Sequence, residues 1–150
     1  MRLGEAKYRS AIVRLGGAAL LVVLMSAGLT ACRSSEQTQV ASLVNQTRVQ
    51  YGRSVLRDNQ QLDVKAQAWA EHLARLNSLA HSHLPDGISY NWRALGENVG
   101  YGGSIAQVHT AYMNSPGHRE NILDPRWNYM GTGVAWRGSR VFTVQVFMQY

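Results

Sequence analysis

The chain of 150 residues is short of several features that decide a protein's class. It has one cysteine, Cys32, so a disulfide within the chain and a zinc site needing two of its thiolates are both excluded. It has three prolines, no internal repeat, and no coiled-coil or collagen period. Apolar residues make up 45% of the chain and charged residues only 16%, which is typical of a single globular domain.

Positive charge is also scarcer in the body of the chain than the net charge of +6 implies. Residues 1–31 carry four basic side chains and one acidic side chain, which is half of that net charge. The other half is spread over residues 33–150 and forms no basic stripe. The sequence therefore predicts no nucleic-acid partner.

A largely apolar and uncharged segment of 17 residues, Leu15–Ala31, follows the basic segment Met1–Arg14. A membrane span usually needs about 20 apolar residues, so the pattern favours a secretory signal. Its end, Leu29-Thr30-Ala31-Cys32, resembles the bacterial lipobox, which implies cleavage before Cys32 and a lipid on its sulfur. An ordinary cleaved signal and an uncleaved anchor are the alternatives.

We therefore expect a lipoprotein signal peptide over residues 1–31 and a lipidated Cys32 followed by a polar tether over residues 32–39. A single domain is expected over residues 40–150. The expected partner is the membrane, and the expected place is the cell envelope, on the extracytoplasmic side of a bacterial membrane.

Helical periodicity marks the first part of this domain. Two faces repeat at three- and four-residue steps: Val40, Leu43, Val44, Thr47 and Tyr51, then Leu62, Ala66, Trp69, Ala70, Leu73 and Leu76. The expected N-caps are Ser34 or Ser35 for the first helix and Asp63 for the second, which should end near Asn77. Ser104 should start a third helix, and Ser115-Pro116 a short fourth helix over His118–Leu123.

The rest of the domain has other patterns. Residues 81–101 are rich in glycine and predict an ordered loop, with a short extended piece near Glu97–Val99. Residues 129–137 and 141–147 predict two strands joined by a turn at Gly138-Ser139. In the second strand, odd-numbered and even-numbered residues from Val141 to Met148 should face opposite ways. Helices followed by an antiparallel sheet indicate an α+β layered fold.

Polar residues suited to chemistry gather between residues 81 and 118: His81, His83, Asp86, Glu97, His109, Ser115 and His118. No tight metal-ligand spacing such as HExxH is present, so only the fold can bring them together. Ser115 and His118 are three residues apart, and together with Glu97 they permit a Ser-His-Glu triad, with Ser115 as nucleophile and His118 as its base. A serine before proline at a helix start is more often an N-cap, and no GxSxG motif surrounds it.

Six motifs together resemble bacterial members of the CAP superfamily, which includes cysteine-rich secretory proteins, insect antigen 5 and plant pathogenesis-related protein 1. In order they are Asn45-Gln46-Thr47-Arg48, Leu79-Ala80-His81-Ser82, Gly96-Glu97-Asn98-Val99, Ser115 to Leu123, Met130-Gly131-Thr132-Gly133-Val134 and Val144-Gln145-Val146-Phe147. They span nearly all of the chain after Cys32.

The resemblance implies a three-layer α-β-α sandwich with a small antiparallel sheet and a central cleft. The family's cleft holds two histidines and two acidic residues. By motif, these positions are His81 (with His83 as the fallback), Glu97, His118 and Ser115, so the second carboxylate is missing here. His81 and His118 could hold a divalent metal such as zinc, and Glu97 could act through a bound water or orient a histidine. The alternative is a buried polar network that only holds the loops.

Three functions follow from the resemblance. The first is a lipid-anchored binding domain whose cleft takes a small apolar or envelope-derived ligand, with or without the help of a metal. The second is a zinc-dependent hydrolase of envelope or peptide substrates, with Glu97 as general base. The third is a protein-interaction module with a vestigial cleft. The missing second acid and nucleophile motif favour a protein that is not an enzyme.

Overall fold

The structure, a computed structural model, describes residues 32–89 and 91–150, which fall within the unit Ala31–Tyr150. The predicted signal peptide lies outside the described residues. Within the described ranges, no helix is both long enough and apolar enough to cross a membrane.

The unit has four helices and four strands in an α+β arrangement, as predicted. In chain order they are α1 (Ser35–Gln50), β1 (Arg57–Asp58), α2 (Gln60–Leu76), β2 (Ala94–Gly102), α3 (Ile105–Asn114), α4 (Pro116–Leu123), β3 (Tyr129–Arg137) and β4 (Arg140–Gln149). The sheet order is β1-β3-β4-β2. β4 pairs antiparallel with β2 and β3, whereas the two-residue β1 pairs parallel with β3, so the sheet is not purely antiparallel.

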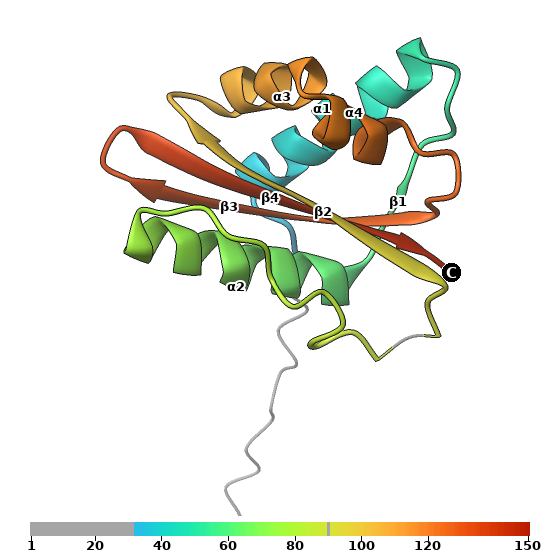
Figure 1. Cartoon of the computed structure of the whole chain (residues 1–150), viewed down its shortest axis with the longest axis horizontal. Helices are drawn as coiled ribbons and strands as arrows, with labels where there is room; N and C mark the ends of the chain where they lie inside the picture. Colours follow the sequence, from blue (N-terminus) through green and yellow to red (C-terminus); the bar gives the residue numbers. More distant parts are fainter. Residues whose placement is uncertain (1–31, 90) are drawn as a thin grey trace, which may run out of the picture. The chain divides into compact units, whose positions relative to one another are not determined.

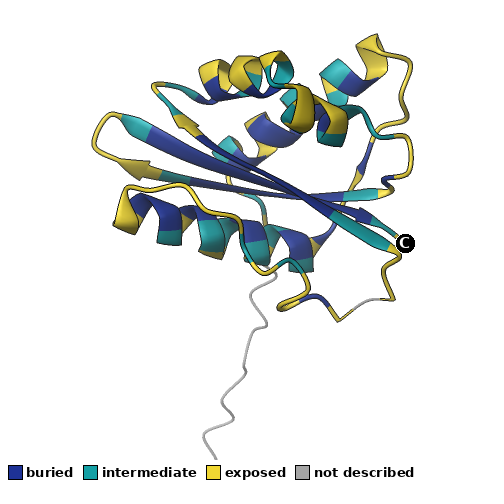
Figure 2. Cartoon of the chain, in the orientation of Figure 1, coloured by how far each residue is buried: buried dark blue, intermediate teal, exposed yellow. Residues whose placement is uncertain are grey.

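Helices cover both faces of this sheet, which gives three layers (Figure 1). α2 packs on one face with Leu62, Ala66 and Leu73, and α1, α3 and α4 cover the other face. The central strand β4 is buried along almost its whole length (Figure 2). Its Val141 and Phe147 belong to one core and its Phe142, Val144, Val146 and Met148 to the other, so the predicted alternation is confirmed.

Two glycines let α2 lie directly on β3. A Cβ atom at Gly131 would come within 2.1 Å of the Leu62 carbonyl carbon, and one at Gly133 within 2.1 Å of the Ala66 carbonyl oxygen. Gln67 of α2 also exchanges two hydrogen bonds with the backbone of Val134, both of 2.9 Å. The helix is therefore fixed on the sheet, and so is the start of the loop that leaves it.

Three expectations need correction. β2 is a full strand of nine residues rather than a short extended piece in a loop. The N-cap of α2 is Asn59, whose side chain accepts a hydrogen bond from the Leu62 N–H, and not Asp63. The predicted tether is folded from Arg33 onward: Ser34 caps α1 through a capping box with Gln37, and Arg33 pairs with Asp63.

Candidate functional site

Three segments that lie far apart in the sequence meet at the β2 edge of the sheet. The loop after α2 carries His81 and Ser82, the edge strand β2 carries Glu97, and the α3–α4 junction carries Ser115 and His118. α2 ends at Leu76, and its C-cap residue Asn77 adopts a left-handed conformation with φ of 53°, which turns the chain back toward β2.

Glu97 is the buried centre of the site. Its side chain is 2% exposed, whereas that of His81 is 65% exposed. Glu97 Oε1 lies 2.8 Å from His81 Nδ1 and accepts a 2.9 Å hydrogen bond from the Ser82 N–H. Glu97 Oε2 accepts a 2.6 Å bond from the Ser82 hydroxyl. Both carboxylate oxygens are thus engaged, and the carboxylate fixes the orientation of the His81 ring.

His118 is fixed by neutral partners. Its Nδ1 lies 2.8 Å from the Ser115 hydroxyl oxygen, and its ring packs on the buried Tyr112 ring with centroids 4.9 Å apart. Tyr112 in turn donates its hydroxyl to the Thr143 carbonyl at 2.9 Å. The Ser115 side chain makes no N-cap hydrogen bond, although α4 does begin at Pro116 as predicted. The capping role expected for this hydroxyl is therefore wrong, because the hydroxyl bonds to His118 instead.

The surroundings of His118 lower the pKa of its imidazole. Burial lowers the pKa of His118, and the charge of a protonated His81 lowers it further. His118 therefore favours its neutral form, which is the form that binds a metal. Among the described residues, the side-chain hydrogen bonds of both rings run through Nδ1, so neither Nε2 is occupied by a protein partner.

Two asparagines hold α4 against β2. The Asn98 amide donates to the His118 carbonyl at 3.1 Å and to Gln145 Oε1 at 3.0 Å. The Asn121 amide donates to the Glu97 carbonyl at 3.1 Å and to Asn98 Oδ1 at 3.0 Å. These residues and Ser82 were not expected as site residues. They stand inside the motifs that carry the family resemblance, which is the signal that could have found them.

The other histidines have different partners. His83 Nδ1 bonds Asp86 Oδ1 at 2.7 Å on an exposed turn, so the structure brings His81, not His83, to Glu97. His72 stacks on Trp69 at 4.6 Å between ring centroids. His109 Nε2 lies 2.8 Å from the Thr47 hydroxyl between α1 and α3, and burial lowers the pKa of this histidine.

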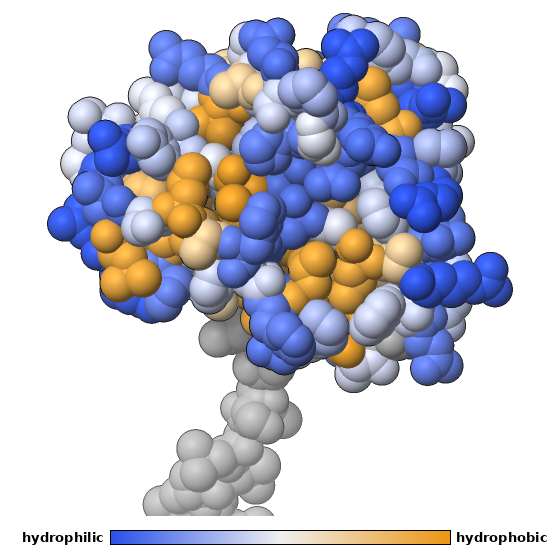
Figure 3. Space-filling view, viewed as in Figure 1, coloured by the Kyte–Doolittle hydropathy of each residue, from blue (hydrophilic) through white to orange (hydrophobic). Residues whose placement is uncertain are grey.

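The site itself offers few metal ligands. Over residues 32–89 and 91–150, no group of three or more His, Cys, Asp or Glu side chains is placed to hold a metal ion. Beside the site, a groove of about 630 Å³ runs between α2 and the following loop, and its lining includes Trp69, Ser82 and His83 but not His81, Glu97 or His118. On the face seen in Figure 3, apolar side chains form separate patches divided by polar ones.

The three-layer α-β-α sandwich, with His81, Glu97 and His118 at one edge of the sheet, agrees with the CAP class of domains that the sequence motifs resemble. Residues 41–148 match the Cysteine-rich secretory protein family (CAP), and the chain belongs to this family.

One relative is the uncharacterized protein YkwD of Bacillus subtilis, 29% identical over 115 residues, which cover 71% of this chain and 45% of that protein. Among solved structures, an extracellular protein with an SCP domain from Bacillus anthracis aligns with a TM-score of 0.67 and 23% identity, over 77% of this chain and 40% of that one. An outer surface protein from Borrelia burgdorferi aligns with a TM-score of 0.66 and 18% identity, over 79% and 96%. The chain thus spans less than half the length of the two Bacillus proteins.

Proposed function

We propose that the protein is an extracytoplasmic, lipid-anchored binding domain whose histidine site takes an envelope-derived ligand with the help of a divalent metal, zinc. One observation carries this proposal. His81 and His118 are each held through Nδ1, by Glu97 and by Ser115, so each has an Nε2 without a protein partner among the described residues. Histidine ligands of metals are commonly oriented in this way, through a hydrogen bond on the second ring nitrogen.

The donor set suits zinc better than calcium or magnesium. Neutral imidazole is a good zinc ligand, whereas the two other cations prefer oxygen. Two protein ligands leave two positions of a tetrahedral ion free, which a ligand carboxylate or carbonyl could fill. With so few protein ligands, we expect a weak site that tightens when such a ligand binds.

The geometry favours binding over hydrolysis. A general base must reach a water with a free oxygen, but both oxygens of Glu97 already accept hydrogen bonds and its side chain is 2% exposed. The Ser115 hydroxyl bonds Nδ1 of His118 and has no carboxylate behind that histidine, so it lacks the triad arrangement of an activated serine. Glu97 is thus best described as a positioning residue.

The test is zinc titration of the soluble domain, residues 33–150, which keeps Arg33 in the folded unit. We expect one equivalent of zinc, lost in the His81→Ala and His118→Ala variants. His83→Ala is the matched control, because His83 is an exposed histidine of the same loop that bonds Asp86 and not Glu97. Equal zinc binding by all three variants would contradict the proposed site.

The anchor is a separate part of the proposal, supported by the lipobox-like Leu29 to Cys32. Expression of the full chain in a bacterial host should give a mature protein that starts at a diacylated Cys32, as measured by mass spectrometry. It should float with lipid vesicles, whereas the Cys32→Ser variant should not. A wild-type chain that stays in the aqueous fraction would refute the anchor and leave the histidine site untouched.

A further inference from the structure

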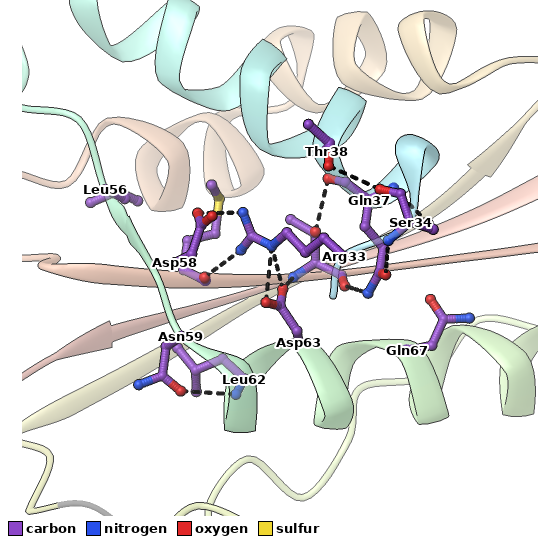
Figure 4. Close-up of polar contacts among 12 residues, drawn as sticks. Arg33, Ser34, Gln37, Thr38, Leu56, Asp58, Asn59, Leu62, Asp63 and Gln67 are labelled. Atoms are coloured by element: carbon purple, nitrogen blue, oxygen red, sulfur yellow. Dashed lines mark hydrogen bonds and ion pairs between the residues drawn. The ribbon is translucent and has the colours of Figure 1, made fainter. Parts of the chain in front are cut away.

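The residue after Cys32 is locked into the fold. The Arg33 guanidinium donates to both carboxylate oxygens of Asp63 at 2.8 and 2.9 Å and to the Met130 carbonyl at 2.8 Å, and it also pairs with Asp58 (Figure 4). The Arg33 side chain is only 10% exposed. Consecutive Cα atoms are about 3.8 Å apart, so Cys32 lies one such step from this fixed point.

The residues that follow Arg33 are also held by hydrogen bonds. The Ser34 N–H donates to Gln37 Oε1 at 2.9 Å, the Gln37 N–H donates to the Ser34 hydroxyl at 3.1 Å, and α1 begins at once. The Gln37 amide then reaches the Thr132 carbonyl of β3. A lipid on Cys32 would therefore be joined to the domain without a flexible spacer.

The Cys32–Arg33 junction and the histidine site, formed by His81, Glu97 and His118, lie at opposite edges of the sheet. Asp58, which pairs with Arg33, is in the edge strand β1 and is in register with Met130 of β3. Met130 is in register with Phe147 of β4, and Phe147 with Gly96 of the other edge strand, β2. Glu97 is the next residue. Asp58, the partner of Arg33, and Gly96, the neighbour of Glu97, are thus the two ends of one row across four strands, which is about 14 Å at 4.8 Å per strand spacing.

From this placement we infer that the lipidated domain stands with its β1 edge on the bilayer and its histidine site turned away from it. The inference rests on the proposed lipid anchor. It deepens the proposed function because the orientation determines which ligands can reach the site. A site turned away from the bilayer would bind a water-exposed envelope component, such as a polar cell-wall fragment, rather than a lipid from the bilayer that holds the anchor. The surface beside the Cys32–Arg33 junction fits this contact, since Val49 and Val55, 59% and 58% exposed, line the same hollow as Arg33 and Asp58.

The single cysteine allows a clean test. In the lipidated protein Cys32 carries the lipid, so an introduced cysteine is the only free thiol. Ser42→Cys and Gln46→Cys place labels near the junction, because both residues line a hollow with Arg33 and Asp58. Ala111→Cys is the matched control on α3, next to Tyr112 of the site, and all three positions are exposed on helices.

Each full-length variant would carry an environment-sensitive fluorophore in phosphatidylethanolamine–phosphatidylglycerol vesicles that contain a lipid with a quencher near the headgroup. We expect labels at positions 42 and 46 to lose most of their fluorescence and the label at 111 to keep it. Equal quenching at all three positions, or stronger quenching at 111, on vesicles that the protein does bind would overturn the orientation. Failure to bind vesicles at all would instead refute the anchor of the proposed function.

A variant with an inserted linker tests whether the missing spacer is what orients the domain on the bilayer. A flexible insert of about ten Gly and Ser residues between Cys32 and Arg33 spans ~17 Å on average, which is more than the width of the sheet. We expect this insert to remove most of the difference between positions 42 and 111. An unchanged difference would show that the missing spacer is not what orients the domain, and would overturn the inference drawn from Arg33.

Discussion

Replacement of Glu97 by glutamine and by alanine separates an orienting carboxylate from a general base. Glutamine can keep its amide oxygen toward His81 Nδ1 and the Ser82 N–H, and its NH2 group can donate to the Ser82 hydroxyl, which now accepts. The Glu97→Gln variant can thus keep all three hydrogen bonds and loses only the negative charge that strengthens them. Alanine leaves the Ser82 N–H and hydroxyl without their partner.

Charge-assisted hydrogen bonds contribute about 1.5–3 kcal/mol each and neutral ones about 0.5–1.5 kcal/mol. The exposed His81 contributes at the low end of that range. We therefore expect the free energy of unfolding to fall by about 2–3 kcal/mol in Glu97→Gln and by about 4 kcal/mol or more in Glu97→Ala, measured by urea denaturation.

Zinc affinity should follow the same order. Loss of a partner that orients a ligating histidine costs about 10- to 100-fold in affinity. We expect Glu97→Gln near the lower end of this range and Glu97→Ala near the upper end, whereas His81→Ala should abolish specific binding. Titration calorimetry on folded variants measures this. Zinc affinities of both Glu97 variants equal to that of the wild type would refute the orienting role.

Three further changes have expected outcomes of their own. Ser115→Asp supplies a pure acceptor to Nδ1 of His118, so zinc affinity should rise by about tenfold in the same titration, and a fall would contradict the arrangement. Gly133→Ala should lower the free energy of unfolding by about 1–3 kcal/mol or more in urea, because its Cβ meets the Ala66 carbonyl; an unchanged value would mean that α2 can shift. Burial lowers the pKa of His109 and His118 below the ordinary histidine value of 6.5, so the unfolded chain binds more protons than the folded one as the pH drops below 6.5. The melting temperature should therefore fall with pH in this range, and it should fall less steeply in His109→Gln. A melting temperature independent of pH there, or equal pH slopes in the wild type and His109→Gln, would refute this.

The sequence was most informative where one residue pattern decides the outcome. The alternation from Val141 to Met148 identifies a strand buried on both faces, and β4 is the central strand between two helical layers. The Ser104 cap is likewise local and is present, since its side chain accepts from the Gln107 N–H. These features depend on neighbours within a few residues, which the sequence displays directly.

The length of β2 was predicted too short because its glycines make room for side chains that come from distant parts of the chain. A Cβ at Gly96 would lie 3.0 Å from the Trp127 ring, and one at Gly100 would lie 2.8 Å from the Tyr112 ring. Glycine is unfavourable in isolated strands, so the local pattern indicates a loop. The aromatic rings that fill the space come from elements elsewhere in the chain, and only the fold shows why small residues are needed.

The site has the same limitation. His81 and Glu97 are sixteen residues apart, and no spacing rule joins them. The motif resemblance supplied these positions, and the geometry then supplied their roles. Ser115 shows the reverse error, because a serine before proline is locally a good cap, yet its hydroxyl bonds His118.

The partners on the two Nδ1 atoms make the histidines unequal. The Glu97 carboxylate can only accept, so it fixes the His81 proton on Nδ1 and leaves the Nε2 lone pair free for a metal. The Ser115 hydroxyl can either donate or accept, so His118 can keep its proton on Nδ1 or place it on Nε2. Only the first tautomer binds a metal through Nε2. The proposed zinc binding therefore requires His118 to adopt that tautomer. This requirement has a free-energy cost, which a carboxylate at position 115 would remove, and it is the physical reason to expect that the proposed site would be weak.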